Sequence, residues 1–117
     1  MKRFKMSTTE DNILVDGISL VRFLGWDVDE VDYYIVPNIG KVNPFLLKFH
    51  NDWNWLMMVV DKVEKSNLGT LEIQSKNLVI ISYNGSTKKY YNDTLLLNTY
   101  NACVEFVKWY AKQVKTE

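Results

Sequence analysis

The segment Leu78-Val79-Ile80-Ile81-Ser82-Tyr83-Asn84-Gly85-Ser86-Thr87-Lys88-Lys89-Tyr90-Tyr91 carries the strongest local signal for a fold in this sequence. Its Asn84-Gly85 pair predicts a two-residue type I′ turn, because both central positions of that turn need a positive φ. The run over 78–83 is apolar on both faces and predicts a strand in the centre of a sheet. The run over 86–91 predicts the returning edge strand, whose two lysines discourage pairing with another sheet.

A third strand and a helix precede this hairpin. Residues 70–75 alternate apolar and polar side chains, which predicts a strand. The clearest helix opens at Asn51-Asp52 and ends near 66–69, with Met57 and Met58 on the two borders of its apolar arc. That arc consists of Trp53, Trp55, Leu56, Val59, Val60 and Val63.

The last helix is predicted to follow a cap at Asn92-Asp93 and to run to about 115. Its polar residues repeat at spacings of three and four and predict one solvated stripe: Asn98, Asn101, Glu105, Lys108 and Lys112. The rest of its circumference is apolar, far wider than the roughly 100° that a surface helix needs. Either this surface packs beneath the sheet and against other helices, or part of it is an oligomer surface.

The N-terminal part predicts a loose tail over 1–8 and two overlapping capping boxes, Ser7 with Glu10 and Thr8 with Asp11. A helix ending at Gly25 follows, although a strand over 13–15 with a turn at Asp16-Gly17 stays open as an alternative.

An acidic loop over 27–32 leads into a strand over 33–36 that Pro37 ends, with an optional second strand over 45–49. We therefore expect the order α-β-(β)-α-β-β-β-α. Residues 1–117 would form a single α+β domain with two layers, an antiparallel meander packed against two or three helices.

Length and charge narrow the class of protein. The chain has 117 residues, the length of one domain of about 100–150 residues. Its 14 Lys and Arg balance 14 Asp and Glu, so it lacks the overall charge that attracts nucleic acids and membrane surfaces. The chain has a single cysteine and lacks the apolar segment of a signal peptide, which predicts a cytoplasmic location. It also lacks any run of roughly 18 apolar residues, so we expect no membrane association.

Candidates for chemistry are few. His50 is the only histidine, and Cys103 falls on the apolar face of the last helix, which predicts an inert buried thiol. Nucleotide-binding glycine loops are absent from the sequence. The 27–32 loop contains four acidic residues, Asp27, Asp29, Glu30 and Asp32, whose spacing does not fit a calcium loop. An enzyme that holds a metal ion on these residues is the last-ranked alternative. We predict no catalytic residues, no metal site, no cofactor and no enzymatic activity.

Two surfaces are candidates for binding. Lys88, Lys89, Tyr90 and Tyr91 combine cations and rings on an exposed strand, as single-stranded nucleic acid requires. A plain edge strand, with gatekeeper lysines and packed tyrosines, is the favoured interpretation of the same residues.

The second surface borders the apolar arcs of the two longer helices, where aromatic and Met side chains are typical interface anchors. Its residues are Met57, Met58, Leu97, Val104 and Trp109. We therefore predict a non-enzymatic interaction or regulatory module that binds an unknown protein partner or forms a homodimer through the C-terminal helix. A nucleic-acid-binding module is the alternative.

Several segments resemble small uncharacterised proteins encoded by phages and prophages of Bacteroidetes bacteria. Residues 48–64 resemble their pattern K-F/Y-H-x-S/D-W-x-W-L-M-x-V-V-x-K-I/V-E, and residues 100–110 are similar to their closing A-V-V-E-F-I-K-W-Y helix. Residues 23–26 and 33–38 are similar to their opening segments, whereas the acidic loop over 27–32 departs from them. The resemblance implies a bacterial or viral cytoplasmic setting and an accessory role, and it carries no known activity.

Overall fold

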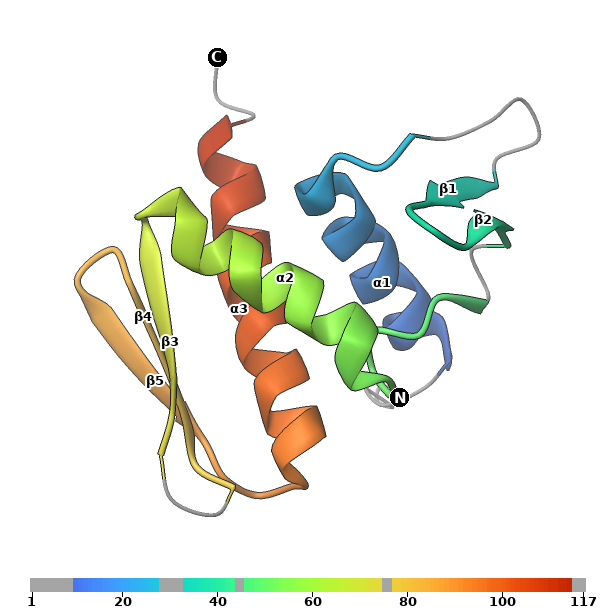
Figure 1. Cartoon of the computed structure of the whole chain (residues 1–117). Coiled ribbons are helices and arrows are strands. Elements are labelled where there is room, and N and C mark those ends of the chain that lie inside the picture. Colours follow the sequence, from blue (N-terminus) through green and yellow to red (C-terminus); the bar gives the residue numbers. More distant parts are fainter. Residues whose placement is uncertain (1–9, 28–32, 44–45, 75–76, 115–117) are drawn as a thin grey trace, which may run out of the picture. The chain divides into compact units, whose positions relative to one another are not determined.

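Two units make up the computed structural model, one formed by residues 1–47 and the other by residues 48–117 (Figure 1). The structure describes residues 10–27, 33–43, 46–74 and 77–114. Its helices and strands follow the order α1-β1-β2-α2-β3-β4-β5-α3, and both sheets are antiparallel. The predicted α+β class is confirmed, and so is the predicted order of elements.

The first unit begins with α1, Glu10–Leu24, which buries Leu20 and Val21. The helix ends at Gly25, where φ is 76° and the backbone N–H donates to the carbonyl oxygen of Val21 over 3.0 Å. The predicted helix is confirmed, and the alternative strand over 13–15 is wrong. The predicted tail over 1–8 and the serine and threonine of the capping boxes lie outside the described residues.

A short hairpin completes this unit, with β1 at Tyr34–Val36 and β2 at Gly40–Val42. The chain reverses directly after Pro37, because Asn38 and Gly40 take φ values of 67° and 108°. The first strand was predicted, but the second pairs earlier in the chain than expected.

The predicted strand over 45–49 is therefore wrong over residues 46–49, where the structure has no strand, and residue 45 lies outside the described residues. Leu47 and Phe49 are buried, whereas Leu46 and Lys48 are exposed. An irregular segment with one buried side produces the same alternation as a strand, which explains the error.

The second unit opens with α2, Trp53–Ser66. The Asp52 carboxylate accepts hydrogen bonds from the backbone N–H groups of Asn54 and Trp55, and Asn67 ends the helix with a φ of 62°. Both predicted ends are confirmed, and five of the six residues of the predicted arc are buried. The sixth, Trp53, is 39% exposed in the first turn of the helix.

A three-stranded antiparallel sheet follows in the order β3-β4-β5, with bounds Gly69–Ile73, Val79–Tyr83 and Ser86–Tyr90. Asn84 and Gly85 have φ values of 52° and 76°, as a type I′ turn requires. The predicted hairpin, its central strand and its edge strand are all confirmed.

The last helix, α3 at Leu95–Val114, packs against this sheet and against α2 (Figure 1). Gly69 shows how closely it packs, because a Cβ added there would lie 2.6 Å from Cε1 of Phe106. Most of the wide apolar surface of α3 is buried in the structure: Tyr100, Ala102, Cys103, Val104, Phe106 and Val107.

Two predictions for α3 are corrected. Its first turn is capped by Thr94, whose Oγ1 accepts from the Leu97 N–H over 3.2 Å, and not by the Asn92-Asp93 pair. Asn98 is 2% exposed and does not belong to a solvated stripe. Its Nδ2 donates to the carbonyl oxygen of Asn77 over 2.7 Å, so its amide satisfies backbone groups where the loop after β3 meets the start of α3.

No helix in the described parts of the chain combines the length and the apolar character that crossing a membrane requires.

Candidate functional site

The three-stranded sheet sorts its side chains onto two faces. Val79, Ile81 and Tyr83 of β4 point to the side of α3, and Lys88 and Tyr90 of β5 lie in register with Ile81 and Val79 on that side. The side chains between these positions point to the opposite face. All three strands therefore contribute to one helix-covered face and one outer face.

This alternation divides the predicted nucleic-acid patch. Lys88 and Tyr90 lie on the side of α3, whereas Lys89 lies on the outer face. Tyr91 follows the end of β5 and is 58% exposed. The structure does not bring the four residues together into one basic and aromatic surface.

On the helix-covered face, Glu105 of α3 holds β5 in place. The Nζ of Lys88 lies 2.6 Å from Oε2 of Glu105, and the Tyr83 hydroxyl donates to the same oxygen. The hydrogen bond from Lys88, together with that from Tyr83, lowers the pKa of the Glu105 carboxyl. The positive charge of Lys88 is therefore compensated within the chain.

The pKa values of the two tyrosines near Glu105 change in the opposite direction to that of Glu105. Burial, and then the hydrogen bond to Glu105 and its negative charge, raise the pKa of Tyr83 to about 12. Burial and then the charge of Glu105 also raise the pKa of Tyr90. Both phenols stay protonated at neutral pH.

The ring of Tyr83 extends the cluster into an aromatic group on α3. Its centroid lies 5.9 Å from that of Phe106 and 5.0 Å from that of Trp109. Trp109, one of the predicted interface residues, is half-buried against these two rings. Its position is that of a packed side chain at the border of the core.

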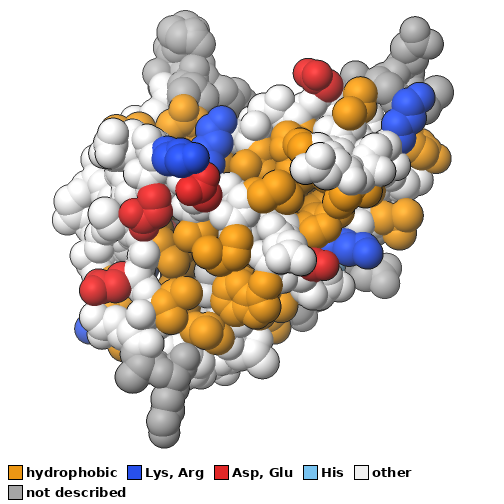
Figure 2. All heavy atoms as spheres, in the orientation of Figure 1, with side chains coloured by type: hydrophobic (Ala, Val, Ile, Leu, Met, Phe, Trp, Pro, Cys, Tyr) orange, Lys and Arg blue, Asp and Glu red, His pale blue; other side chains and the backbone are white. Residues whose placement is uncertain are grey.

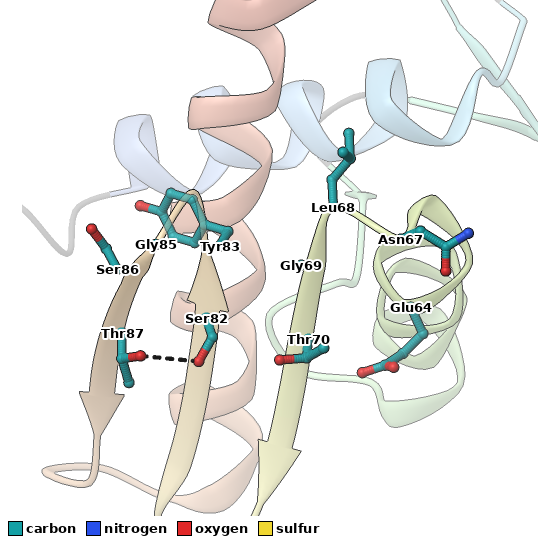
Figure 3. Close-up of a pocket in the computed structure, with 10 residues that line it drawn as sticks. All are labelled: Glu64, Asn67, Leu68, Gly69, Thr70, Ser82, Tyr83, Gly85, Ser86 and Thr87. Atoms are coloured by element: carbon teal, nitrogen blue, oxygen red, sulfur yellow. Dashed lines mark hydrogen bonds between the residues drawn. The ribbon is translucent and has the colours of Figure 1, made fainter.

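The outer face carries a hollow of about 550 Å³ at the hairpin end of the sheet. Figure 3 shows Thr70, Ser82 and Thr87 in a row across the three strands, which agrees with their register. Ser82 Oγ lies 3.2 Å from Thr87 Oγ1. Hydroxyl groups therefore dominate the floor of the hollow, and the Glu64 side chain reaches toward it from α2 (Figure 3).

One edge of the sheet is closed by the same glutamate. The backbone N–H of Leu71 in β3 points away from β4 and donates to Oε2 of Glu64 over 2.9 Å. A side chain from α2 thus occupies the backbone donor that would otherwise be available to another strand.

The other edge, along β5, is open. Tyr83 and Ser86 flank the two-residue turn and pair through hydrogen bonds, so the Thr87 and Lys89 backbone groups point away from β4. Within the described parts of the chain, no strand pairs with that side of β5. Residues 86–89 are exposed.

The second predicted surface is partly present on α2. Met57 is 45% exposed and Met58 is half-buried, while Trp53 lies one helical turn before Met57 on the same side of the helix. Figure 2 shows hydrophobic side chains gathered on the face of this unit that α2 crosses. The predicted residues on α3 offer less surface, because Leu97 is half-buried and Val104 is only 7% exposed.

The residues considered for catalysis lie in packed surroundings. Cys103 is fully buried, as predicted, and this burial raises the pKa of its thiol. His50 is half-buried, its ring centroid lies 6.2 Å from that of Tyr100, and burial lowers its pKa.

Among the described residues, no group of three or more His, Cys, Asp or Glu side chains could hold a metal ion. Of the acidic loop, only Asp27 is described, and Asp29, Glu30 and Asp32 lie outside the described residues.

No family model, curated protein or solved structure matches this chain. The arrangement around β5 therefore has to be interpreted from its own chemistry.

Glu105 was expected on a solvated stripe, and its contacts with Tyr83 and Lys88 were not predicted. The sequence did contain a signal for these contacts. Side chains alternate between the two faces of a strand, which puts Tyr83 and Lys88 on the same face as the apolar Val79 and Ile81. What the sequence did not contain was the register that brings Glu105 of α3 opposite them.

Proposed function

We propose that this protein is a small non-enzymatic protein-interaction module. The observation that carries the proposal is the exposure of Trp53 and Met57, which lie one turn apart at the border of the buried face of a capped helix. Large aromatic side chains and adaptable Met side chains at solvent-facing positions are frequent anchors at protein interfaces.

The contact surface is proposed on α2 rather than on α3. The homodimer expected through the C-terminal helix needs an apolar surface there, and most of that surface is already buried within the chain. Met57 and Trp53, by contrast, are already exposed in the folded chain, so a partner can reach them without a change in the fold.

The class of partner follows from the resemblance of the sequence to phage and prophage proteins. An accessory protein from such a source would act on a protein of its bacterial host. A folded host protein with an apolar groove would accept the Trp53–Met57 surface.

Affinity capture with the full chain tests this proposal. The tagged chain is incubated with host lysate, with and without nuclease, and bound proteins are identified by mass spectrometry. We expect a stoichiometric protein that survives nuclease and is lost with the double variant Trp53→Ala and Met57→Ala.

The matched control is the double variant Asn54→Ala and Asp61→Ala, which alters exposed positions of the same helix. It should retain the partner. Bound material that disappears with nuclease would support the nucleic-acid alternative, and equal capture by both double variants would refute α2 as the contact surface.

A further inference from the structure

We propose that β5 captures an extended acidic segment of a partner protein as an additional antiparallel strand. The inference rests on the proposed interaction function and adds the open edge of the sheet to it as a second binding surface, with the class of segment that this edge accepts. Strand addition uses backbone hydrogen bonds for affinity and alternate side chains for specificity.

The backbone geometry of the two sheet edges selects β5. At the β3 edge, the outward N–H of Leu71 is already bonded to Glu64. At the β5 edge, Thr87 and Lys89 direct their N–H and C=O groups outward, and among the described residues no strand takes them up. A peptide with residues opposite Thr87 and Lys89 would exchange two hydrogen bonds with each of them.

β5 is held in an extended conformation before any partner arrives. The Asn84-Gly85 turn fixes its first residue, and the Nδ2 of Asn77 donates to the carbonyl oxygen of Tyr91 over 3.0 Å just after its last residue. Between these ends, Lys88 is joined to Glu105. A strand ordered in advance loses less conformational entropy on binding, which favours capture.

Charge indicates what the added strand contains. Lys89 is exposed on the outer face, and within the described chain it forms no ion pair. In an antiparallel pair, the residue directly opposite places its Cβ about 4.5–5.5 Å away on the same face, where an opposite charge is favourable. An Asp or Glu opposite Lys89 is therefore the expected anchor.

The same register rule argues against a second copy of β5 as the occupant. The register that overlaps the whole of β5 pairs Thr87 with Lys89 of a second copy and places Lys88 opposite Lys88, and the register centred on Lys89 places Lys89 opposite Lys89. Like charges directly opposite each other destabilise a sheet. An acidic segment of another protein avoids both arrangements.

The hollow on the outer face specifies the next side chain. The peptide residue opposite Thr87 would lie beside the row of hydroxyls formed by Thr70, Ser82 and Thr87. A Ser or Thr fits there, since Thr–Thr and Thr–Ser pairs across strands form hydrogen bonds. Read from its N-terminus, the segment is acidic, then any residue, then Ser or Thr.

Titration of the labelled full chain with a designed peptide tests the inference. The probe is acetyl-Ser-Thr-Val-Glu-Val-Thr-Val-Ser-amide, added to millimolar concentration while amide hydrogen exchange is followed by NMR. We expect the exchange of the Thr87 and Lys89 amides to slow by about tenfold or more, and that of the Ser86 and Lys88 amides, which already bond to β4, to change little. A probe with Lys in place of Glu should bind about fivefold more weakly.

Backbone methylation supplies a matched pair of controls. Methylating the amide nitrogen of the Glu, which faces β5 in the proposed register, should abolish the protection. Methylating that of the valine between Glu and Thr, which faces away, should leave it unchanged. Equal effects of the two methylated probes would overturn the strand-addition geometry.

A charge reversal tests the role of Lys89. The Lys89→Glu variant changes an exposed side chain, and circular dichroism verifies its fold. It should prefer the Lys-containing probe over the Glu-containing probe. An unchanged preference would overturn the acidic assignment.

The result also separates this inference from the proposed function. If the partner bound through Trp53 and Met57 is captured but no probe slows the Thr87 and Lys89 amides, the strand inference is refuted and the interaction function stands. If the Glu-containing probe protects those amides while no partner binds through α2, the strand inference stands and the α2 surface is refuted. Protection of the same amides that grows with the concentration of the chain alone would overturn the acidic segment in favour of a second copy.

Discussion

The two edge strands of the sheet, β3 and β5, have the same length and the same central neighbour, yet their surroundings differ. β3 starts at Gly69 directly against the ring of Phe106, and Glu64 occupies the outward N–H of Leu71. β5 has exposed side chains at its first four positions, and its outward backbone groups have no partner strand in the described structure.

Chain connectivity explains this difference. β3 follows α2 after a two-residue link, so the last turns of the helix lie beside the strand and can supply Glu64. β5 follows a two-residue turn and precedes a loop, so no helix or strand adjacent in sequence covers the edge of the sheet that β5 forms. An edge strand is therefore closed or open according to what precedes and follows it, although its own residues determine that it is a strand.

The largest expected effect is at the packed start of β3. Gly69→Ala places a Cβ against the Phe106 ring, and such overpacking should lower the free energy of unfolding by about 1–3 kcal/mol. Urea denaturation measures this change. Ser86→Ala is the matched control on β5, because Ser86 and Gly69 are both cross-strand partners of Tyr83. It should change stability by less than about 0.5 kcal/mol, and equal losses would contradict the proposed asymmetry.

A smaller effect is expected when the closed edge is opened. Glu64→Ala removes the acceptor of the Leu71 N–H and should cost about 1 kcal/mol in the free energy of unfolding. Exchange of the Leu71 amide hydrogen should accelerate at the same time. Glu64→Gln keeps an acceptor oxygen and should show less of both effects. If Leu71 exchanges at the same rate in all three proteins, the glutamate does not close the edge.

The attachment of β5 to α3 should show a dependence on acidic pH. The folded-state pKa of Glu105 lies below its ordinary value, so its contribution to stability is present above that ordinary value and is lost as the pH falls through the folded pKa. Glu105→Gln should therefore be less stable than the wild type at pH 7, by less than about 1 kcal/mol because Lys88 is half-exposed. Chemical denaturation at several pH values should show the difference closing in acid, with exposed Glu72→Gln as the control. A difference that is constant with pH would contradict the ion pair.

The smallest effect concerns Tyr83 and appears only in base. Its folded-state pKa of about 12 exceeds the ordinary value of 10, so its contribution is complete below pH 10 and is lost as the pH rises toward 12. The difference in ultraviolet absorbance between wild type and Tyr83→Phe reports this single phenol. In Glu105→Gln its midpoint should fall part of the way toward 10, because burial still raises the pKa. An unchanged midpoint would show that Glu105 has no part in the shift.

Local patterns allowed the correct prediction of several elements. The Asn84-Gly85 turn and the Asp52 cap depend on residues within a few positions of each other, so their signals lie in the sequence itself. The same local reasoning misplaced the second strand at 45–49, since one-sided burial of Leu47 and Phe49 imitates a strand.

The candidate site was less accessible to prediction. Lys88 and Lys89 were identified as a pair, but only the pairing of β5 with β4 and the position of α3 assign Lys88 to Glu105 and place Lys89 on the outer face. Asn98 was expected in solvent, and its burial depends on backbone groups more than twenty residues earlier in the chain.

The sequence by itself determined the helices and the three-stranded sheet with its hairpin, because turns, caps and apolar periods act over a few residues. Only the tertiary structure decided which edge of the sheet is closed, which lysine is compensated and which helix exposes its aromatic side chain. These properties depend on contacts between residues distant in the chain, such as Lys88 with Glu105, and their geometry arises only when the helices pack against the sheet.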